Sequence, residues 1–129
     1  MATFQHFTDI EAWQKTRELT NQIYKVTKQA AFSKDFELRG QIRAASVSAM
    51  SNIAEGFERN GTAEFVQFLS IAKGSVAEVA SQLYVALDER YVTAEQFEVL
   101  SALARDTNRK IGGLMNYLRR SGIKGLKFR

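Results

Sequence analysis

The fold is decided by the stretch F-V-Q-F-L-S-I-A-K-G-S-V-A-E-V-A-S-Q-L-Y-V-A-L at residues 65–87. It carries two charged residues, Lys73 and Glu78, in a chain that is 25% charged. Apolar and small residues recur in it at alternating spacings of four and three, which is typical of the seam of a helix in a supercoiled bundle. That seam consists of Phe65, Leu69, Ala72, Val76, Val79, Leu83 and Ala86. Further apolar residues lie off the seam, so we expect a helix that is buried on more than one side.

The same spacing predicts three further helices. The 129 residues contain no proline, which favours long uninterrupted helices. The four predicted helices cover about residues 9–31, 35–56, 62–89 and 94–121, and a basic tail follows at 122–129. Connections of a few residues force sequential neighbours to run antiparallel. The sequence therefore predicts one domain over residues 1–129, an all-α antiparallel up-down-up-down four-helix bundle.

Capping signals define the ends of these helices. A Thr followed three positions later by Glu or Gln is the pattern of a capping box, and a Gly after the last periodic residue is a common C-terminal cap. In chain order the predicted caps are Thr8 with Glu11, Gly56, Thr62, and Thr93 with Gln96. We expect Ala30 to be the last inward-facing residue of the first helix and Leu114 to face inward on the fourth.

Composition argues against several classes of protein. There is no cysteine and a single histidine, so neither a disulfide framework nor a thiolate metal site is expected, and we predict no metal and no cofactor. The first residues, M-A-T-F-Q-H-F-T, lack the pattern of a signal peptide, and no stretch approaches 18 apolar residues. We therefore expect no membrane association and a cytoplasmic location.

Catalytic signatures are poor. The chain has no G-x-S-x-G, no P-loop and no G-x-G-x-x-G, and His6 precedes the first helix, where a catalytic base would be poorly held. Glu55 and Glu78 lie in largely uncharged segments, where we expect burial and salt bridges to cations. The cations available are Arg39, Arg43, Arg59 and Lys73. A metal or small ligand held in the bundle core is a weaker alternative. No catalytic residue is predicted, and we expect that the protein is not an enzyme.

A second apolar face on the two middle helices predicts a homo-oligomer. The second helix presents a stripe outside its inward set that extends to Phe57, and the third helix has a back face of small and apolar residues. On a monomer these faces would form a sizeable exposed apolar patch. The predicted interface residues are Val47, Met50, Ala54, Val66, Ser70, Gly74, Ala77, Ser81 and Tyr84. The alternative is that the tail or the loops cover these faces.

Positive charge is concentrated at the C-terminal end. From residue 105 onward there are eight basic residues and one acid, so this quarter carries +7 while the rest of the chain carries −3. Clustered cations bind phosphate backbones by releasing counterions, without contacts to bases. The predicted nucleic-acid-binding residues are Arg105, Arg109, Lys110, Arg119, Arg120, Lys124, Lys127 and Arg129. The alternative is that these cations complement a helix dipole and keep the protein dissolved.

Several blocks of sequence resemble one protein family. They are F-x-x-F-x-D-I-E-A-W-Q at 4–14, I-Y at 23–24, Q-I-R-A-A-S-V-S at 41–48, S-N-I-A-E-G at 51–56, and I-A-K-G-S at 71–75 followed by Glu78. In order and spacing they resemble the four helix bundle protein family, also called the 23S ribosomal RNA intervening-sequence protein family. The resemblance spans residue 4 to about residue 118. Relatives usually carry a proline between the first two helices, where this chain has Ala31, Phe32 and Ser33.

The resemblance implies an antiparallel four-helix bundle that assembles into a ring, often a pentamer, in bacteria. It brings no established catalytic residues. A more distant branch resembles accessory proteins that bind nucleic acid and a reverse transcriptase through a basic surface of the ring. Two functions of different classes follow: a ring that binds RNA or DNA through its basic C-terminal surface, and an oligomeric scaffold for another protein that does not itself bind nucleic acid.

Overall fold

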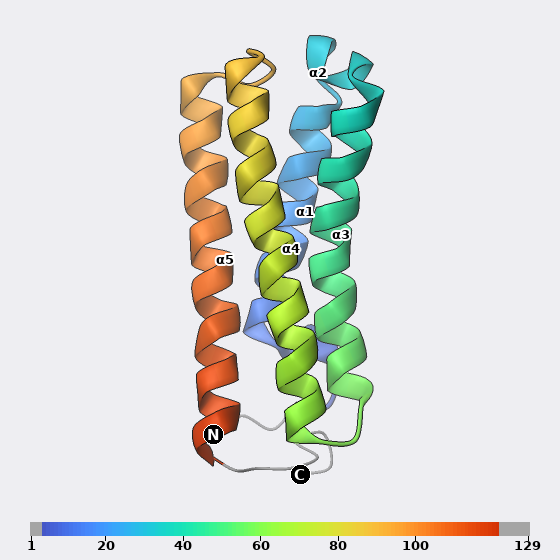
Figure 1. Cartoon of the computed structure of the whole chain (residues 1–129), viewed down its shortest axis with the longest axis vertical. Helices are drawn as coiled ribbons and strands as arrows, with labels where there is room; N and C mark the ends of the chain where they lie inside the picture. Colours follow the sequence, from blue (N-terminus) through green and yellow to red (C-terminus); the bar gives the residue numbers. More distant parts are fainter. Residues whose placement is uncertain (1–3, 122–129) are drawn as a thin grey trace.

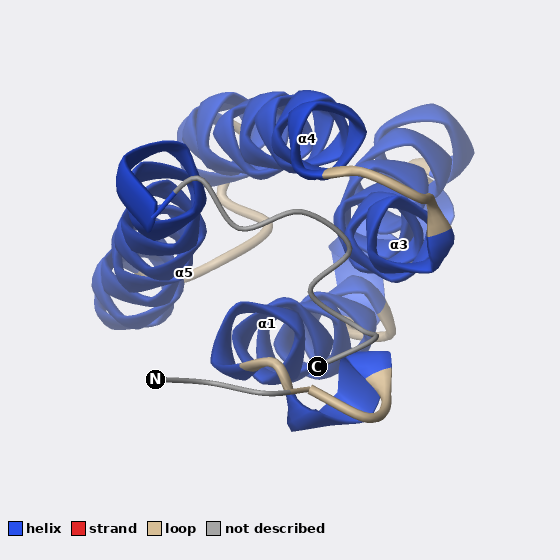
Figure 2. Ribbon diagram, turned by 90° about the horizontal axis from the view of Figure 1, so that it is seen from below, coloured by secondary structure: helices blue, strands red, loops and turns tan. Residues whose placement is uncertain are grey.

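Four long helices form an antiparallel bundle in the computed structural model, which describes residues 4–121 (Figure 1). They are α1 (Glu11–Thr27), α3 (Phe36–Glu58), α4 (Thr62–Asp88) and α5 (Ala94–Ser121). Seen along the bundle, α1 lies beside α3 and α5, and α4 lies between α3 and α5 (Figure 2). Each long helix runs opposite to the one before it, so the predicted up-down-up-down topology is confirmed.

The first predicted helix is interrupted, and its predicted extent over residues 9–31 is wrong. The chain leaves α1 at Thr27 and forms a separate short helix, α2 (Ala30–Lys34), at the end of the bundle. Phe32 explains the break: its side chain is fully buried and its ring stacks on Tyr91 at 5.1 Å between centroids. A continuous helix would carry this ring past the end of the core. Ala30, predicted to face inward, is exposed.

The predicted capping box at Thr8 is also wrong. Residues Phe7–Asp9 form a 3-10 turn, η1, and α1 begins after Ile10, which makes no side-chain cap. The carboxylate of Asp9 accepts the backbone N–H groups of Gln5 at 3.0 Å and His6 at 3.1 Å. An ionised carboxylate is a stronger acceptor than a threonine hydroxyl, so the turn forms around Asp9 instead.

The core follows the predicted seams. All seven seam residues of α4 are buried, and so are the inward residues of α3, which are Leu38, Ile42, Ala45, Ala49 and Ile53. Two predictions at the end of α3 are wrong, because the helix continues past Gly56 to Glu58 and the ring of Phe57 is 3% exposed. A Cβ on Gly56 would lie 2.6 Å from Cβ of Phe68, so this glycine permits close contact between α3 and α4.

The start of α5 has the predicted capping box. Thr93 N–H donates to Oε1 of Gln96 at 2.9 Å, and Gln96 N–H donates to Oγ1 of Thr93 at 3.0 Å. The cap predicted at Thr62 is wrong by one residue, because Gly61 occupies the cap position and Thr62 begins α4. On α5, Leu114 is half-buried and the neighbouring Met115 is buried in its place.

Candidate nucleic-acid interface

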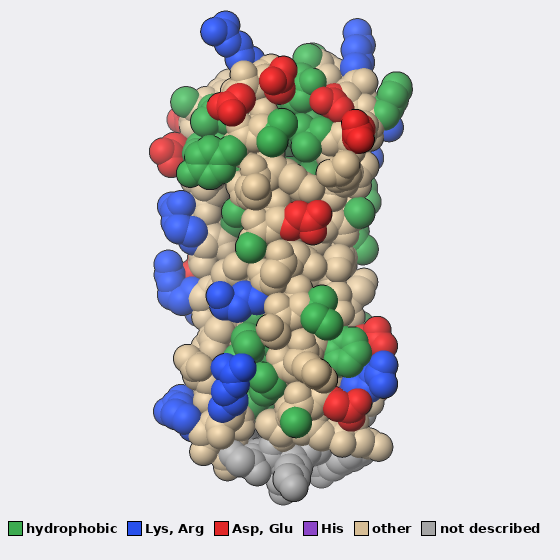
Figure 3. All heavy atoms as spheres, in the orientation of Figure 1, with side chains coloured by type: hydrophobic (Ala, Val, Ile, Leu, Met, Phe, Trp, Pro, Cys, Tyr) green, Lys and Arg blue, Asp and Glu red, His purple; other side chains and the backbone are tan. Residues whose placement is uncertain are grey.

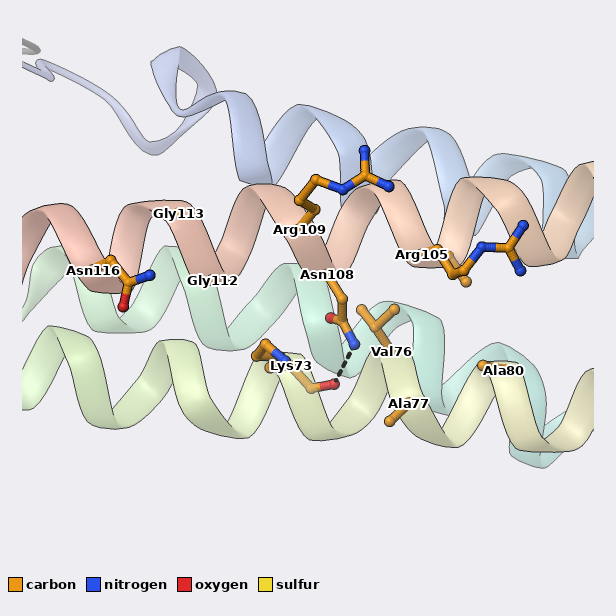
Figure 4. A pocket seen from close by; sticks show the side chains of 11 residues that line it. Lys73, Val76, Ala77, Ala80, Arg105, Asn108, Arg109, Gly112, Gly113 and Asn116 are labelled. Atoms are coloured by element: carbon orange, nitrogen blue, oxygen red, sulfur yellow. Dashed lines mark hydrogen bonds between the residues drawn. The ribbon is translucent and has the colours of Figure 1, made fainter.

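A groove of about 710 Å³ runs between α4 and α5 (Figure 4). Eleven residues line it: Lys73, Val76, Ala77, Ala80, Ala104, Arg105, Asn108, Arg109, Gly112, Gly113 and Asn116. We call it the basic groove, because three of these residues are cations and none is an acid. Such a surface attracts anions, although the carboxylate of Asp106, which lies outside the lining, contacts Arg109 and offsets part of its charge.

The three cations come from both walls. Arg105 and Arg109 extend from α5, and Lys73 comes from the facing side of α4 (Figure 4). The side chain of Arg109 is 74% exposed and its guanidinium contacts Asp106 at 3.2 Å, so most of its donors face solvent. An exposed ion pair of this kind contributes little to stability, and a phosphate can compete with it.

The two helices touch at the middle of the groove. Nδ2 of Asn108 donates to the backbone carbonyl of Lys73 at 3.2 Å. Oδ1 of the same amide is shielded from solvent and accepts no hydrogen bond. A buried acceptor without a donor costs free energy, of order 1–3 kcal/mol, and no ligand in the groove can reach this oxygen while the side chain keeps its position.

Two adjacent glycines form part of the α5 wall. A Cβ on Gly113 would meet nothing within 4 Å, and one on Gly112 would meet only Cε of Lys73, at an ordinary 3.5 Å. Packing inside the bundle therefore does not require glycine at either position. Each glycine in a helix interior costs about 1 kcal/mol relative to alanine.

The predicted basic residues do not form one surface. Arg105 and Arg109 line the basic groove, whereas Lys110 lies on the side facing α1, where its ammonium pairs with Glu11 at 3.4 Å. Arg119 and Arg120 are exposed in the last turn of α5. The remaining three, Lys124, Lys127 and Arg129, lie outside the described residues.

Lys73 was not among the predicted binding residues. Counting charge along the chain cannot find it, because it lies on another helix, more than thirty residues before Arg105. One signal did exist, since it is the lone cation of the nearly charge-free stretch 65–87. A solitary lysine on an apolar helix indicates either a pairing partner or a ligand.

Charge is also separated along the length of the bundle. Figure 3 shows Lys and Arg side chains along the α5 side of this face, and Asp and Glu side chains gathered at the end where α4 meets α5. Exposed acids at that end include Asp88, Glu89 and Glu95. Lys and Arg side chains also protrude from that end (Figure 3), so the charge separation is partial and a polyanion is attracted mainly toward the basic groove.

The predicted oligomer interface is mostly accessible in the single chain. Six of its residues are exposed, namely Val47, Ser70, Gly74, Ala77, Ser81 and Tyr84. Three are half-buried, namely Met50, Ala54 and Val66. Ile71 and Val85, at 52% and 45% exposure, add to the apolar surface of α4. The tail, which was the alternative cover for these faces, lies outside the described residues.

The two glutamates singled out from the sequence are not buried. Glu55 is exposed and pairs with Arg59 at 2.8 Å, which confirms the predicted salt bridge but not the predicted burial. Glu78 is exposed too, and its nearest partner is the amide of Gln82 at 3.4 Å. Both lie on outward faces of their helices, where small neighbours leave them open to water. His6 is exposed in the segment before α1.

The part of the chain that the structure describes, residues 4–121, contains no group of three or more His, Asp or Glu side chains placed to hold a metal ion. Among the same residues no helix is both long and apolar enough to cross a membrane.

The comparisons with known proteins agree with this architecture. A model of the 23S rRNA-intervening sequence protein family matches residues 8–113. The chain belongs to that family. A solved structure from Bacteroides thetaiotaomicron VPI-5482, described as a protein with unknown function from the S23 ribosomal protein family, has the same fold. The TM-score is 0.75 at 23% identity, over 81% of this chain and 95% of that one. No curated protein matches the chain.

The family match covers most of the basic groove. Lys73 and the α5 residues from Arg105 to Gly113 fall within residues 8–113, whereas Asn116 and the last-turn arginines lie beyond them. The blocks that carried the resemblance in the sequence lie on α1, α3 and α4. The S-N-I-A-E-G block ends at Gly56, so its glycine has a packing role against Phe68.

Proposed function

We propose that this member of the 23S rRNA-intervening sequence protein family binds the phosphate backbone of nucleic acid through the basic groove and the adjoining surface of α5. The observation that carries the proposal is a groove of about 710 Å³ lined by Lys73, Arg105 and Arg109 without an acidic residue. Cations so placed gain affinity from counterion release, which needs no base contact. The net charge of +4 acts in the same direction.

The test is salt-dependent binding by a charge-matched pair of variants. Changing Lys73, Arg105 and Arg109 together to Gln removes three charges from the groove. The control changes Lys25, Lys28 and Lys34 to Gln, which removes the same charge from exposed positions on α1, on α2 and between them.

We expect the groove variant to lower both the affinity for a labelled oligonucleotide and the slope of log K against log salt, by up to about 0.7–0.9 for each lost phosphate contact. The control should retain the slope of the unmodified protein. Equal losses of affinity in the two variants would mean that binding depends on net charge and not on the groove. If the protein binds no oligonucleotide even in low salt, the proposal is wrong.

We also propose that the protein is a homo-oligomer that assembles through the outer faces of α3 and α4. The exposed apolar side chains there, including Val47, Ile71 and Val85, support it. Of the predicted interface residues, Ala77 lines the basic groove and Tyr84 lies just beyond it, so this subunit contact would not include them. A ring of subunits would place several basic grooves on one particle and multiply the field. The family resemblance favours a pentamer, and we propose that it acts in the cytoplasm.

The competing function is an oligomeric scaffold whose partner is another protein. The exposed apolar surface of α4 favours it equally, because such patches mark protein interfaces of any kind. Purification from the native cell with and without nuclease separates the two functions: a protein partner retained after nuclease treatment supports the scaffold, and one lost with the nucleic acid supports binding through the groove. In either case we propose a role without catalysis.

A further inference from the structure

The basic groove is a shallow, open depression along the contact between α4 and α5. Its walls are two helices in direct contact, joined by the hydrogen bond from Asn108 to the Lys73 carbonyl, and helices in contact lie about 8–10 Å apart between axes. Proteins that read the base sequence of duplex DNA insert a convex element, such as a helix, into a major groove about 12 Å wide. A recess between two helices offers no such element, but it can take one extended strand.

The α5 wall leaves room for a strand to approach the backbone. Gly112 and Gly113 have no side chains, and the fold makes no packing demand for their absence. Ala77 and Ala80 keep the facing wall equally low. Small residues alone would not define a site, but here they line a cavity with cations on both sides.

The polar groups of the groove match an unpaired strand. Arg105 and Arg109 are one turn apart, about 6 Å along α5. The guanidinium of Arg109 points away from α4 and contacts Asp106, so it would turn to reach a phosphate in the groove (Figure 4).

An aromatic ring lies one turn beyond Ala80 on α4. Tyr84 is 60% exposed, and its ring packs edge-to-face on the ring of Phe97, with 4.8 Å between the centroids. Sites for single strands combine a cationic groove with exposed aromatic rings on which bases stack. Tyr84 provides such a ring at the end of the groove nearest Arg105.

We infer that the ligand of the basic groove is a single strand of nucleic acid and not a duplex, an inference that rests on the proposed function. Phosphates contact Lys73, Arg105 and Arg109, the strand passes over Gly112, and a base stacks on Tyr84.

The test compares one labelled strand of about 12 nucleotides, within the usual range of site sizes, alone and annealed to its complement. Fluorescence anisotropy in low salt measures both affinities. The variant Gly112→Leu adds bulk to the groove without changing charge, and its Cβ would meet only Cε of Lys73, at 3.5 Å. Gly40→Leu is the control, because Gly40 is an exposed helix glycine away from the groove whose Cβ would meet nothing within 4 Å.

We expect the single strand to bind the unmodified protein about tenfold more tightly than the duplex, a difference of ~1.4 kcal/mol. Gly112→Leu should remove that preference, while Gly40→Leu should keep it. Tighter duplex binding, or a preference that survives Gly112→Leu, would overturn the single-strand inference and leave the proposed function standing. Absence of binding to either ligand would overturn both. A change in the mass of Gly112→Leu measured by sedimentation, without a change in strand preference, would identify the groove as a contact between subunits and overturn the inference.

Discussion

The phenol of Tyr91 donates a 2.8 Å hydrogen bond to the carboxylate of Asp35, 56 positions earlier in the chain. The other oxygen of Asp35 accepts the N–H of Leu38 at 3.0 Å and so caps α3. The ring of Tyr91 also stacks on Phe32. One tyrosine in the α4–α5 connection therefore fixes both α2 and the start of α3 at the same end of the bundle.

Replacing Tyr91 by Phe should destabilise the protein without changing its fold. The variant keeps the ring that stacks on Phe32 but leaves one oxygen of Asp35 without its donor. We expect a lower urea midpoint with an unchanged m-value. Tyr84→Phe is the control, because the exposed Tyr84 makes a ring contact and no hydrogen bond through its hydroxyl. Equal midpoints for the two variants would mean that the Asp35 contact contributes nothing.

Acid should weaken this end of the bundle through Asp35. The N–H of Leu38, and then the hydroxyl of Tyr91, lower the pKa of the Asp35 carboxyl below its usual value of 3.8. Because the folded pKa is the lower one, the carboxylate stabilises the fold fully above about pH 4, near the unfolded pKa, and this contribution is lost as pH falls through the folded pKa.

The variant Asp35→Asn should therefore differ most from the unmodified protein near neutral pH, and the difference should shrink in acid. Urea midpoints measured from neutral pH down to about pH 2 test this, since the folded pKa lies below the unfolded value near 3.9. Backbone N–H groups of His6 and Gln5 lower the pKa of Asp9 in the same way, so Asp35→Asn should retain part of the acid sensitivity. A difference that is constant across this range would exclude a role for the ionised carboxylate.

Helix periodicity was sufficient to predict the core, because each seam residue is set by its own neighbours at three and four positions. Two features depended on distant partners. The chain turns at Phe32 because its ring stacks on Tyr91 at the end of the bundle. No residue close to Phe32 in the sequence indicates this contact. From its neighbours in the sequence, Gly56 is predicted to end a helix. Its observed role is to allow close packing against Phe68, which depends on the position of α4.

The candidate site was predictable only in part for the same reason. Charge counting found Arg105 and Arg109, since they share a helix. It also included Lys110, whose position one residue further along α5 turns it toward α1 and Glu11. It missed Lys73, which joins the groove only through the packing of α4 on α5.

Gly56→Ala and Gly40→Ala should change stability in opposite directions. Both substitutions gain up to about 1 kcal/mol of helix propensity. At Gly40 nothing opposes the gain, because a Cβ there meets nothing within 4 Å. At Gly56 the new Cβ would clash with Cβ of Phe68, which cannot move away without its helix, and overpacking of this kind costs about 1–3 kcal/mol.

Urea denaturation of both variants measures the outcome. We expect Gly40→Ala to raise the unfolding free energy and Gly56→Ala to lower it, with a separation of about 1–3 kcal/mol. If Gly56→Ala is as stable as Gly40→Ala, α3 and α4 can separate freely and the close contact is not needed.

The last prediction concerns assembly through α4. Gly74 is exposed near the middle of that helix, and a Cβ on it would meet nothing within 4 Å, so Gly74→Glu should leave the bundle of a single chain intact. If the outer face of α4 lies between subunits, the substitution buries a charge without a partner and should dissociate the oligomer. Sedimentation should then give a monomer near 14.5 kDa with unchanged helix content by circular dichroism. Ala102→Glu, on the exposed side of α5, should keep the mass of the unmodified protein. A monomeric unmodified protein at micromolar concentration would contradict the assembly proposal, and loss of helix content in Gly74→Glu would place this face inside the fold.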